Sequence, residues 1–166
     1  MILYLIRHGK AHPSTETNPD DLRPLTEDGK IELLKIAKVW REMGIVFDKI
    51  LTSPIFRAKE TAKIIAEVYE WTGSIEESNV LGHEFHVEGV IAKLKTLKGK
   101  KKIALVAHNP DLGILASAFL GCDASPCVDF EKNAIMGIKF AGVPASGTGS
   151  LQFYLPPNFL RRFFEE

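Results

Sequence analysis

The sequence predicts an α/β fold, a three-layer sandwich in which a mostly parallel central sheet is flanked by helices. Two observations lead to this prediction. Short apolar runs rich in strand formers alternate along the chain with longer segments of helical periodicity. The chain has 166 residues, whereas the alternative, an eight-stranded α/β barrel, needs about 250. We therefore expect residues 1–166 to form a single domain with a sizeable core.

The first third of the chain is predicted to hold a strand, a loop and a helix. Residues 2–6 are apolar and are followed by charge and glycine, which is typical of a buried strand. Residues 10–25 are polar and contain three prolines, so we expect a long loop, and such loops are often functional. Thr26 has the residue type of a helix N-cap, and Gly44 that of a helix end. Between them, apolar residues recur at helical spacing.

The rest of the chain continues this alternation. Residues 47–51 are the second strand candidate. Ser53 followed by Pro54 predicts an N-cap and a first helical position, and helical spacing continues to Trp71. The 159–164 segment is aromatic and is expected to pack on the chain's own core, the alternative being a docking helix. The other predicted elements are helix 87–97, strand 103–107, helix 111–120 and two late strands, 133–141 and 150–155, that a hairpin could join.

Composition disfavours several classes of protein. Twenty-one Lys and Arg balance 21 Asp and Glu, and the pI is near 7.0, which argues against a nucleic-acid partner. The basic run 98–102 is interpreted as a solvated turn that leads into a strand. No secretory signal or membrane-length apolar run is found, so we expect a cytoplasmic protein without a membrane partner. Cys122 and Cys127 match neither a CxxC redox pair nor a zinc ribbon and are expected to be reduced thiols.

Chemically versatile residues follow the ends of the predicted strands. Arg7, His8 and Gly9 follow the first strand. Arg57 lies in the first turn of the helix after the second strand, and His108 directly follows a later strand. Ligands of open α/β sheets bind beyond the carboxyl ends of the strands. We therefore expect two histidines and two arginines to gather at one sheet edge, with no carboxylate in these three loops.

This combination of groups suits phosphoryl transfer. Two guanidinium groups can donate bidentate hydrogen bonds to phosphate oxygens. A neutral imidazole, that of His8, can act as the nucleophile if one ring nitrogen is free and the other is protonated. Gly9 would let a backbone carbonyl approach and accept that proton. Taken singly, the Arg-His-Gly tripeptide, His108 and Arg57 are each compatible with ordinary polar residues, so the hypothesis rests on their convergence.

Four motifs carry a resemblance to a known family. They are Arg7-His8-Gly9, Arg23-Pro24-Leu25-Thr26 with Gly29, Ser53-Pro54-Ile55-Phe56-Arg57-Ala58 with Thr61, and Ala107-His108-Asn109-Pro110. Over residues 2–120 the chain resembles the histidine phosphatase superfamily. The short chain and the Arg-Pro-Leu-Thr element most resemble its SixA-type branch of protein-histidine phosphatases. The resemblance implies a phosphoglycerate mutase-like fold.

The resemblance also implies roles for individual residues. His8 would be the nucleophile and would pass through a phosphohistidine intermediate that water hydrolyses. The phosphate pocket around it would be formed by Arg7, Arg57 and His108. Arg23 is expected either to reach the substrate phosphate, or the protein that carries it, or to anchor the loop at the surface. The family needs no metal and no cofactor.

A general acid is harder to assign. Superfamily members that act on esters place a carboxylic acid in the segment after the second helix, where Glu84 is the first candidate and Glu88 the second. Each could instead be a charge at a helix N-terminus. The SixA-type branch has no firmly placed acid, because an imidazole can leave phosphohistidine as a neutral group. His83 and His86 lack the i,i+4 spacing of a metal motif, so no metal site is expected there.

These observations lead to three functional hypotheses. The first is a metal-independent phosphatase that dephosphorylates phosphohistidine on a signalling protein. The second is a phosphomonoesterase for a small sugar or nucleotide phosphate. The third is a non-catalytic phosphoryl-binding module, against which the presence of both His8 and His108 counts. The expected partner is thus a phosphohistidine-bearing protein or a small phosphorylated metabolite.

Overall fold

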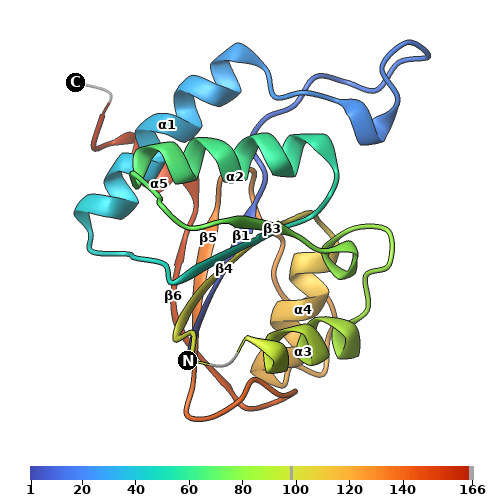
Figure 1. Ribbon diagram of the computed structural model, residues 1–166, viewed down its shortest axis with the longest axis vertical. Coiled ribbons are helices and arrows are strands. Elements are labelled where there is room, and N and C mark those ends of the chain that lie inside the picture. The colour runs from blue at the N-terminus through green and yellow to red at the C-terminus, as the bar shows by residue number, and fades with distance from the viewer. Residues whose placement is uncertain (98, 165–166) are drawn as a thin grey trace.

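The computed structural model describes residues 1–97 and 99–164. Within these residues, six strands form one mixed sheet in the order β3-β2-β4-β1-β5-β6, which runs through the middle of the molecule (Figure 1). The strands are β1 (Ile2–Arg7), β2 (Lys49–Thr52), β3 (Ile75–Glu77), β4 (Lys102–Ala107), β5 (Ile135–Phe140) and β6 (Gly149–Leu155). Lys98, the first residue of the basic run, lies outside the described residues.

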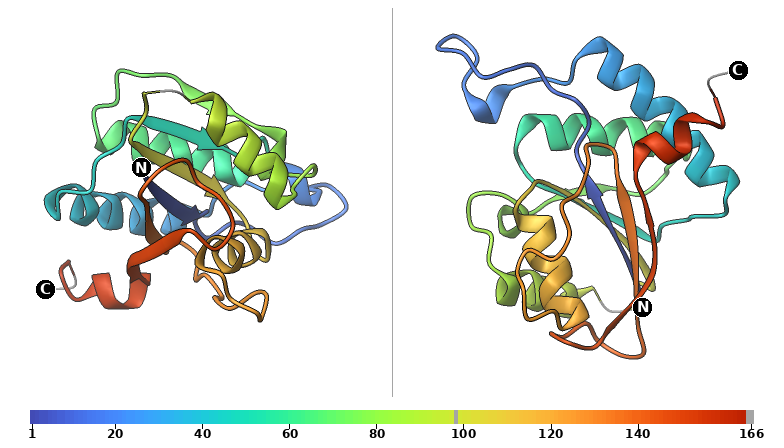
Figure 2. Two further views of the ribbon diagram at one scale, coloured as in Figure 1. Left: turned by 90° about the horizontal axis from the view of Figure 1, so that it is seen from below. Right: turned by 180° about the vertical axis from the view of Figure 1, so that it is seen from behind.

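Helices cover both faces of this sheet, as predicted for a three-layer sandwich (Figures 1 and 2). The helices on one face are α1 (Glu27–Glu42), α2 (Phe56–Val68) and the short α5 (Pro157–Arg161), and those on the other are α3 (Val87–Thr96) and α4 (Asp111–Leu120). Side chains of β1 alternate between the two cores: Leu5 packs with the α3 and α4 side, and Ile6 with the α1 and α2 side. Among the described residues, every helix is too short or too polar to cross a membrane.

The four strands β3, β2, β4 and β1 are parallel, which brings their carboxyl ends to one edge. Leu5 of β1 pairs with Leu105 of β4, and Leu51 of β2 pairs with the same residue from the other side. β5 and β6 complete the sheet as an antiparallel hairpin. The predicted mostly parallel sheet and late hairpin are therefore confirmed, and the edge where β1, β2 and β4 end is the expected ligand edge.

Local signals fixed several element boundaries. Thr26 is the N-cap of α1, and its Oγ1 accepts a hydrogen bond from Gly29 N at 3.0 Å. Gly121 ends α4 in the left-handed conformation, as its position predicts. The Ser53 prediction was wrong: α2 begins at Phe56, with Ile55 at the N-cap position. The Ser53 hydroxyl instead lies 2.7 Å from His108 Nε2, and residues 54–55 form a bend before the helix begins.

Two segments depart from simple periodicity. β3 was not predicted, because its sequence Ile-Glu-Glu has no apolar run and it forms a short strand at the sheet edge. The predicted 10–25 loop contains the 3₁₀ turn η1 (Asp20–Leu22). A side chain at Gly29 would bring its Cβ within 2.4 Å of Lys10 O, so this glycine lets the loop cross the start of α1.

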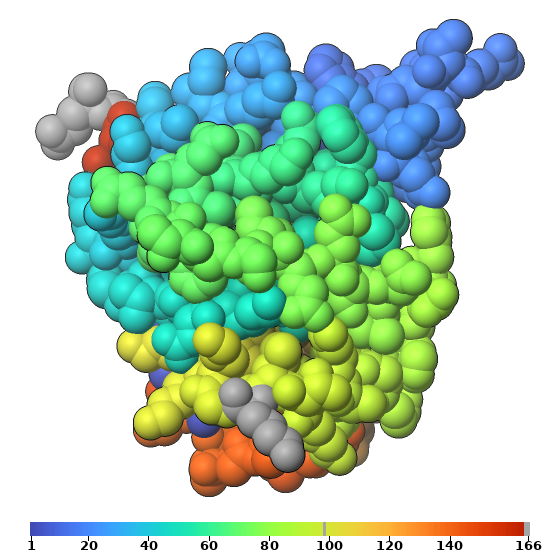
Figure 3. All heavy atoms as spheres, in the orientation of Figure 1, coloured from blue at the N-terminus to red at the C-terminus, as the bar shows by residue number. Residues whose placement is uncertain are grey.

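The loop and the segment after α2 meet at one corner of the molecule, where Figure 3 shows them in blue and light green. That segment contains a second 3₁₀ turn, η2 (Asn79–Leu81). In the aromatic tail, Leu160 is fully buried against the α1 and α2 core, as expected. Phe159 and Phe163 are exposed, so the prediction that the whole tail packs inward was wrong for these two residues.

Candidate active site

His8 directly follows β1 and is almost completely buried, with 5% of its surface exposed. Its Nδ1 lies 2.7 Å from Gly9 O, and since a carbonyl only accepts hydrogen bonds, Nδ1 carries the proton. Nε2 therefore has a free lone pair, which accepts a hydrogen bond from Arg57 Nε at 3.1 Å. A carbonyl thus holds the ring in the tautomer expected of a nucleophile, and that carbonyl belongs to Gly9 itself.

Arg57 enters the site from the first turn of α2 and is also buried. Thr61, one helical turn later, ties this helix to the His8 loop. Its Oγ1 donates to Arg57 O at 2.7 Å and accepts from Gly9 N at 3.0 Å. The position of the Arg57 guanidinium group relative to His8 is therefore fixed in two ways: by the contacts of Thr61 with the backbone of Gly9 and Arg57, and by the hydrogen bond between Arg57 and His8.

His108 follows β4, and its ring centroid lies 5.1 Å from that of His8. The buried His108 Nε2 is hydrogen-bonded to Ser53 Oγ at 2.7 Å. Its Nδ1 is buried and has no hydrogen-bond partner among the described residues. Parallel pairing of β1 with β4, Ile6 opposite Val106, sets the two histidines side by side.

Arg7, the last residue of β1, reaches toward the 128–133 loop. Its Nη1 donates a short hydrogen bond to Phe130 O, which also accepts from Asn109 Nδ2 at 3.0 Å. Within the described part of the chain, the buried Arg7 Nε has no hydrogen-bond partner. Two buried polar nitrogens of this cluster, Arg7 Nε and His108 Nδ1, are thus unsatisfied, which leaves both of them able to bond a ligand.

Burial controls the protonation of both histidines. It is the largest influence on His8 and lowers its pKa to about 3; the hydrogen bond to Gly9 opposes the shift, and the charges of His108 and Arg57 add to it. The pKa of His108 falls to about 4, again mainly through burial and then through the charge of Arg57. Both imidazoles are therefore neutral at pH 7, as a nucleophilic His8 requires.

These two pKa values predict loss of stability in acid. Between pH 6.5 and about 4, the unfolded chain takes up protons on both histidines that the folded chain does not, so the free energy of unfolding should fall as the pH falls. The slope is at most about 1.4 kcal/mol per pH unit for each histidine. Thermal unfolding of the wild type and of the double variant His8→Asn/His108→Asn between pH 7 and 4.5 measures it. The double variant should lose less stability; parallel profiles would contradict the assignment.

A carboxylate that was not expected joins the cluster. The 10–25 loop brings Asp20 onto Arg57, with Asp20 O 2.7 Å from Nη1 and Oδ2 3.1 Å from Nη2. Burial alone would raise the pKa of Asp20, but hydrogen bonds and charges from Arg23 and Arg57 outweigh this and lower it. The prediction of a site free of carboxylates holds for the three strand-end loops, but a fourth segment supplies one.

Arg23 holds Asp20 and has no contact with His8 among those described. Its Nε and Nη2 lie 2.9 Å and 2.6 Å from Asp20 Oδ1, and its Nη1 donates to His12 O at 2.9 Å. In this state the side chain therefore fastens the loop, which fits the anchor interpretation. Asp20 thus lies between the guanidinium groups of Arg23 and Arg57.

The acid candidates lie outside the cluster. Glu84 and Glu88 are exposed, and none of the described side-chain contacts joins either of them to the two histidines. His83, the neighbour of Glu84, contacts the 10–25 loop: its Nε2 is 2.8 Å from Asp21 Oδ2. It also lines a groove of about 220 Å³ with residues of the loop and of the α2 start, namely Asp21, Leu22, Pro54, Ile55, Phe56 and Lys59.

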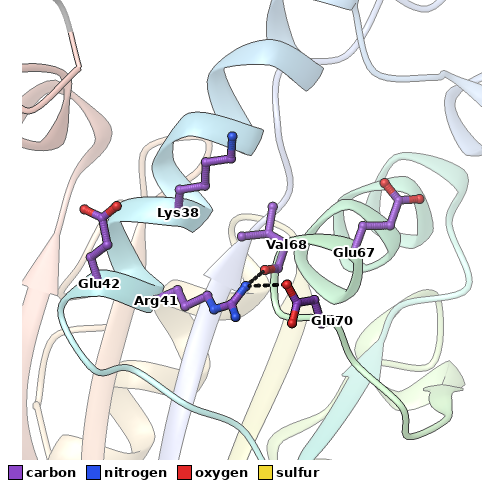
Figure 4. A pocket seen from close by; sticks show the side chains of 6 residues that line it. All are labelled: Lys38, Arg41, Glu42, Glu67, Val68 and Glu70. Atoms are coloured by element: carbon purple, nitrogen blue, oxygen red, sulfur yellow. Dashed lines mark hydrogen bonds and ion pairs between the residues drawn. The ribbon is translucent and has the colours of Figure 1, made fainter.

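A second hollow lies far from this chemistry. Figure 4 shows it between α1 and the end of α2, with a volume of about 580 Å³. Its side chains are mostly charged and exposed, and Arg41 Nη1 bridges it to Val68 O at 2.6 Å. None of the residues that line it belongs to the histidine cluster. In the described part of the chain, no three His, Cys, Asp or Glu side chains converge as a metal site.

Comparisons of sequence and fold with known proteins point to one family. The sequence model of the histidine phosphatase superfamily (branch 1) matches residues 3–81. An uncharacterized protein of Picosynechococcus sp. is 31% identical over 84% of this chain and 85% of its own. Phosphohistidine phosphatase SixA of Escherichia coli is 25% identical over 97% of each chain. The solved structure of the protein histidine phosphatase SixA complexed with tungstate superposes with a TM-score of 0.84 at 25% identity, over 96% of this chain and 99% of that one.

Proposed function

Because the chain belongs to the histidine phosphatase superfamily, we propose that it is a phosphatase that removes the phosphoryl group from phosphohistidine on a signalling protein. One observation carries the proposal. A buried, neutral His8 presents an unprotonated Nε2 that lies 3.1 Å from Arg57 Nε and faces a second histidine. The overall similarity to SixA supports phosphohistidine as the substrate.

In the first step, His8 Nε2 attacks the phosphorus atom in line with the substrate's P–N bond. The new P–Nε2 bond forms as the old P–N bond breaks, and the leaving ring, protonated on its other nitrogen, takes the electron pair and departs as neutral imidazole. Phosphoryl oxygens replace Asp20 on Arg57 and satisfy the buried Arg7 Nε and His108 Nδ1. The dianionic group favours the protonated form of His108, which then donates to it.

In the second step, water attacks the phosphorus atom of the phosphorylated His8. The P–Nε2 bond breaks, the electron pair returns to the ring, and inorganic phosphate leaves. The Gly9 carbonyl holds the Nδ1 proton throughout, which stabilises the positive charge on the phosphorylated ring. His8 is thereby restored to its starting tautomer.

Asp20 competes with the phosphoryl group for Arg57, which predicts a gain in oxyanion binding when its charge is removed. Asp20→Asn should lower the inhibition constant of tungstate roughly two- to fivefold, the range expected for loss of a partly exposed ion pair. Asp21→Asn is the matched control, since the neighbouring Asp21 carboxylate bonds His83 instead of Arg57. Equal inhibition constants for the wild type and Asp20→Asn would contradict the competition.

We further propose that His83, rather than Glu84, faces the leaving group, because it lines the groove beside the start of α2. His83→Gln should slow hydrolysis of phosphate esters by roughly 10²-fold, as expected for loss of a general acid, and slow phosphohistidine turnover much less. Glu84→Gln should leave both rates near those of the wild type. The opposite ranking of the two variants would return the acid role to Glu84.

The substrate class is tested by comparing kcat/KM for a histidine-phosphorylated protein with that for a panel of sugar phosphates and nucleotide monophosphates. We expect the phosphoprotein to be preferred by orders of magnitude. Preference for one small ester would establish the phosphomonoesterase alternative. Binding of tungstate without turnover of any substrate would leave only a phosphoryl-binding module.

A further inference from the structure

The two cysteines face each other across a tight loop. Cys122 and Cys127 lie in the connection between α4 and β5, and both side chains are exposed. Their Sγ atoms are 2.8 Å apart. Covalently bonded sulfurs lie about 2.05 Å apart, so a displacement of less than about 1 Å would join them. The loop thus already holds the thiols in a position to react with each other.

A single helix residue holds both cysteines in place. Cys122 N donates to Ser117 O at 3.0 Å, which places this cysteine directly after the end of α4. Cys127 N donates to Ser117 Oγ at 2.7 Å, and that hydroxyl in turn donates to Gly113 O at 2.8 Å. A side chain at Gly113 would bring its Cβ within 2.4 Å of Val128 O, so the loop lies directly on the helix backbone. Hydrogen bonds and close packing of the backbone on α4 therefore hold the two cysteines in the positions that bring their sulfurs together.

The segment that follows this loop contacts the candidate active site through Phe130. Three residues after Cys127, the fully buried Phe130 offers its carbonyl to Arg7 Nη1 and to Asn109 Nδ2. Cys127 is held on α4 at one end of this segment, and Arg7 is held by Phe130 at the other. A constraint on the 122–127 loop therefore bears on the position of the Arg7 guanidinium group.

We propose that Cys122 and Cys127 form a site of reversible oxidation, at which a peroxide converts the thiol pair into an intramolecular disulfide and thereby restrains the segment that holds Arg7. The bond forms whatever the substrate of the site is, so this inference goes beyond the proposed function. The proposal also changes the interpretation of the spacing between the two cysteines. The four residues between them match no known motif, yet the end of α4 and Ser117 bring the two thiols together.

The chemistry requires a two-electron oxidant, here hydrogen peroxide. One thiolate attacks a peroxide oxygen, an S–O bond forms, and the O–O bond breaks to release hydroxide. The second thiolate attacks the resulting sulfenic sulfur, an S–S bond forms, and the S–O bond breaks to release a second hydroxide. The two sulfurs supply the two electrons, and the two thiol protons convert the hydroxides into water. A dithiol reductant reverses the oxidation.

The test uses the full-length protein, treated with hydrogen peroxide and then freed of it. We expect the intact mass to decrease by two hydrogens, a peptide map to contain the Cys122–Cys127 link, and dithiothreitol to reverse both changes. Cys122→Ser and Cys127→Ser should show neither change. Thiols that survive treatment, sulfinic acids without a link, or dimers joined between chains would each overturn the proposal. These readouts do not depend on activity, so they remain decisive if the proposed function fails.

The coupling to Arg7 is tested separately by kinetics. We expect oxidation to change the kcat/KM of the wild type for a histidine-phosphorylated protein roughly two- to thirtyfold. This is the range of couplings that are transmitted through packed segments. Dithiothreitol should restore the original value. The Cys122→Ser/Cys127→Ser double variant, treated identically, should not respond. An oxidised wild type with unchanged kinetics, or a double variant that responds equally, would refute the coupling.

Discussion

Replacing His8 by alanine should abolish turnover, with kcat reduced by roughly 10⁴- to 10⁶-fold, as expected for removal of a covalent nucleophile. Among the described residues, it is the neutral His8 ring that accepts the hydrogen bond from Arg57 Nε, through its Nε2. The residual rate should come from phosphoryl binding by the remaining site residues. Steady-state hydrolysis of a histidine-phosphorylated protein measures the loss.

A matched histidine variant controls for this change. His86 is exposed, and its Nδ1 contacts Glu84 O instead of a site residue. His86→Ala should therefore leave kcat within about twofold of the wild type, as is usual for surface positions. The His8 variant should also remain folded, which circular dichroism checks. A folded His8→Ala protein with more than a few per cent of wild-type turnover would exclude His8 as the nucleophile.

Replacing Arg57 should produce the second largest loss. Arg57→Ala removes the guanidinium group that contacts His8, and we expect kcat/KM to fall roughly 10²- to 10³-fold or more, as for loss of a preorganised transition-state donor. Arg57→Lys keeps the charge but loses the planar fork and the Nε–H donor, so it should remain at least tenfold impaired. Hydrolysis rates over a range of substrate concentrations separate the effects on kcat and KM.

An arginine outside the site provides the comparison. Arg41 is exposed and bridges to Val68 O and Glu70 in the second hollow (Figure 4). Arg41→Ala should leave kcat/KM near that of the wild type. Full activity of Arg57→Lys would mean that only charge matters at this position, and the bidentate role of Arg57 would then be wrong.

The strand-end residues could be predicted because sheet topology makes them converge. Apolar runs identified β1, β2 and β4, and parallel pairing then places Arg7, His8 and His108 on one edge regardless of the side-chain details. The tautomer of His8 could also be predicted, because that prediction requires only a backbone carbonyl that can approach the ring at a glycine. The geometry confirms that carbonyl, and it belongs to Gly9.

The contributions of the loops could not be predicted in this way. Asp20 reaches Arg57 from a 3₁₀ turn, and His83 contacts the same loop from an irregular segment. Neither segment has a periodicity that fixes where its side chains lie. One signal was present: a carboxylate three residues before Arg23 in a proline-rich loop can bridge two arginines. The role of Ser53 also depends on a contact that is distant in sequence: its hydroxyl bonds His108 instead of capping α2.

Trapping the phosphorylated enzyme tests the central claim most directly. The protein is mixed with radiolabelled histidine-phosphorylated protein, quenched in alkali at times shorter than one turnover, and digested. The account predicts label on the peptide that contains His8, stable in base and released by acid, forming and decaying as fast as phosphate is produced. Label on a different residue, or phosphate release without any labelled enzyme, would contradict a mechanism in which His8 carries the phosphoryl group.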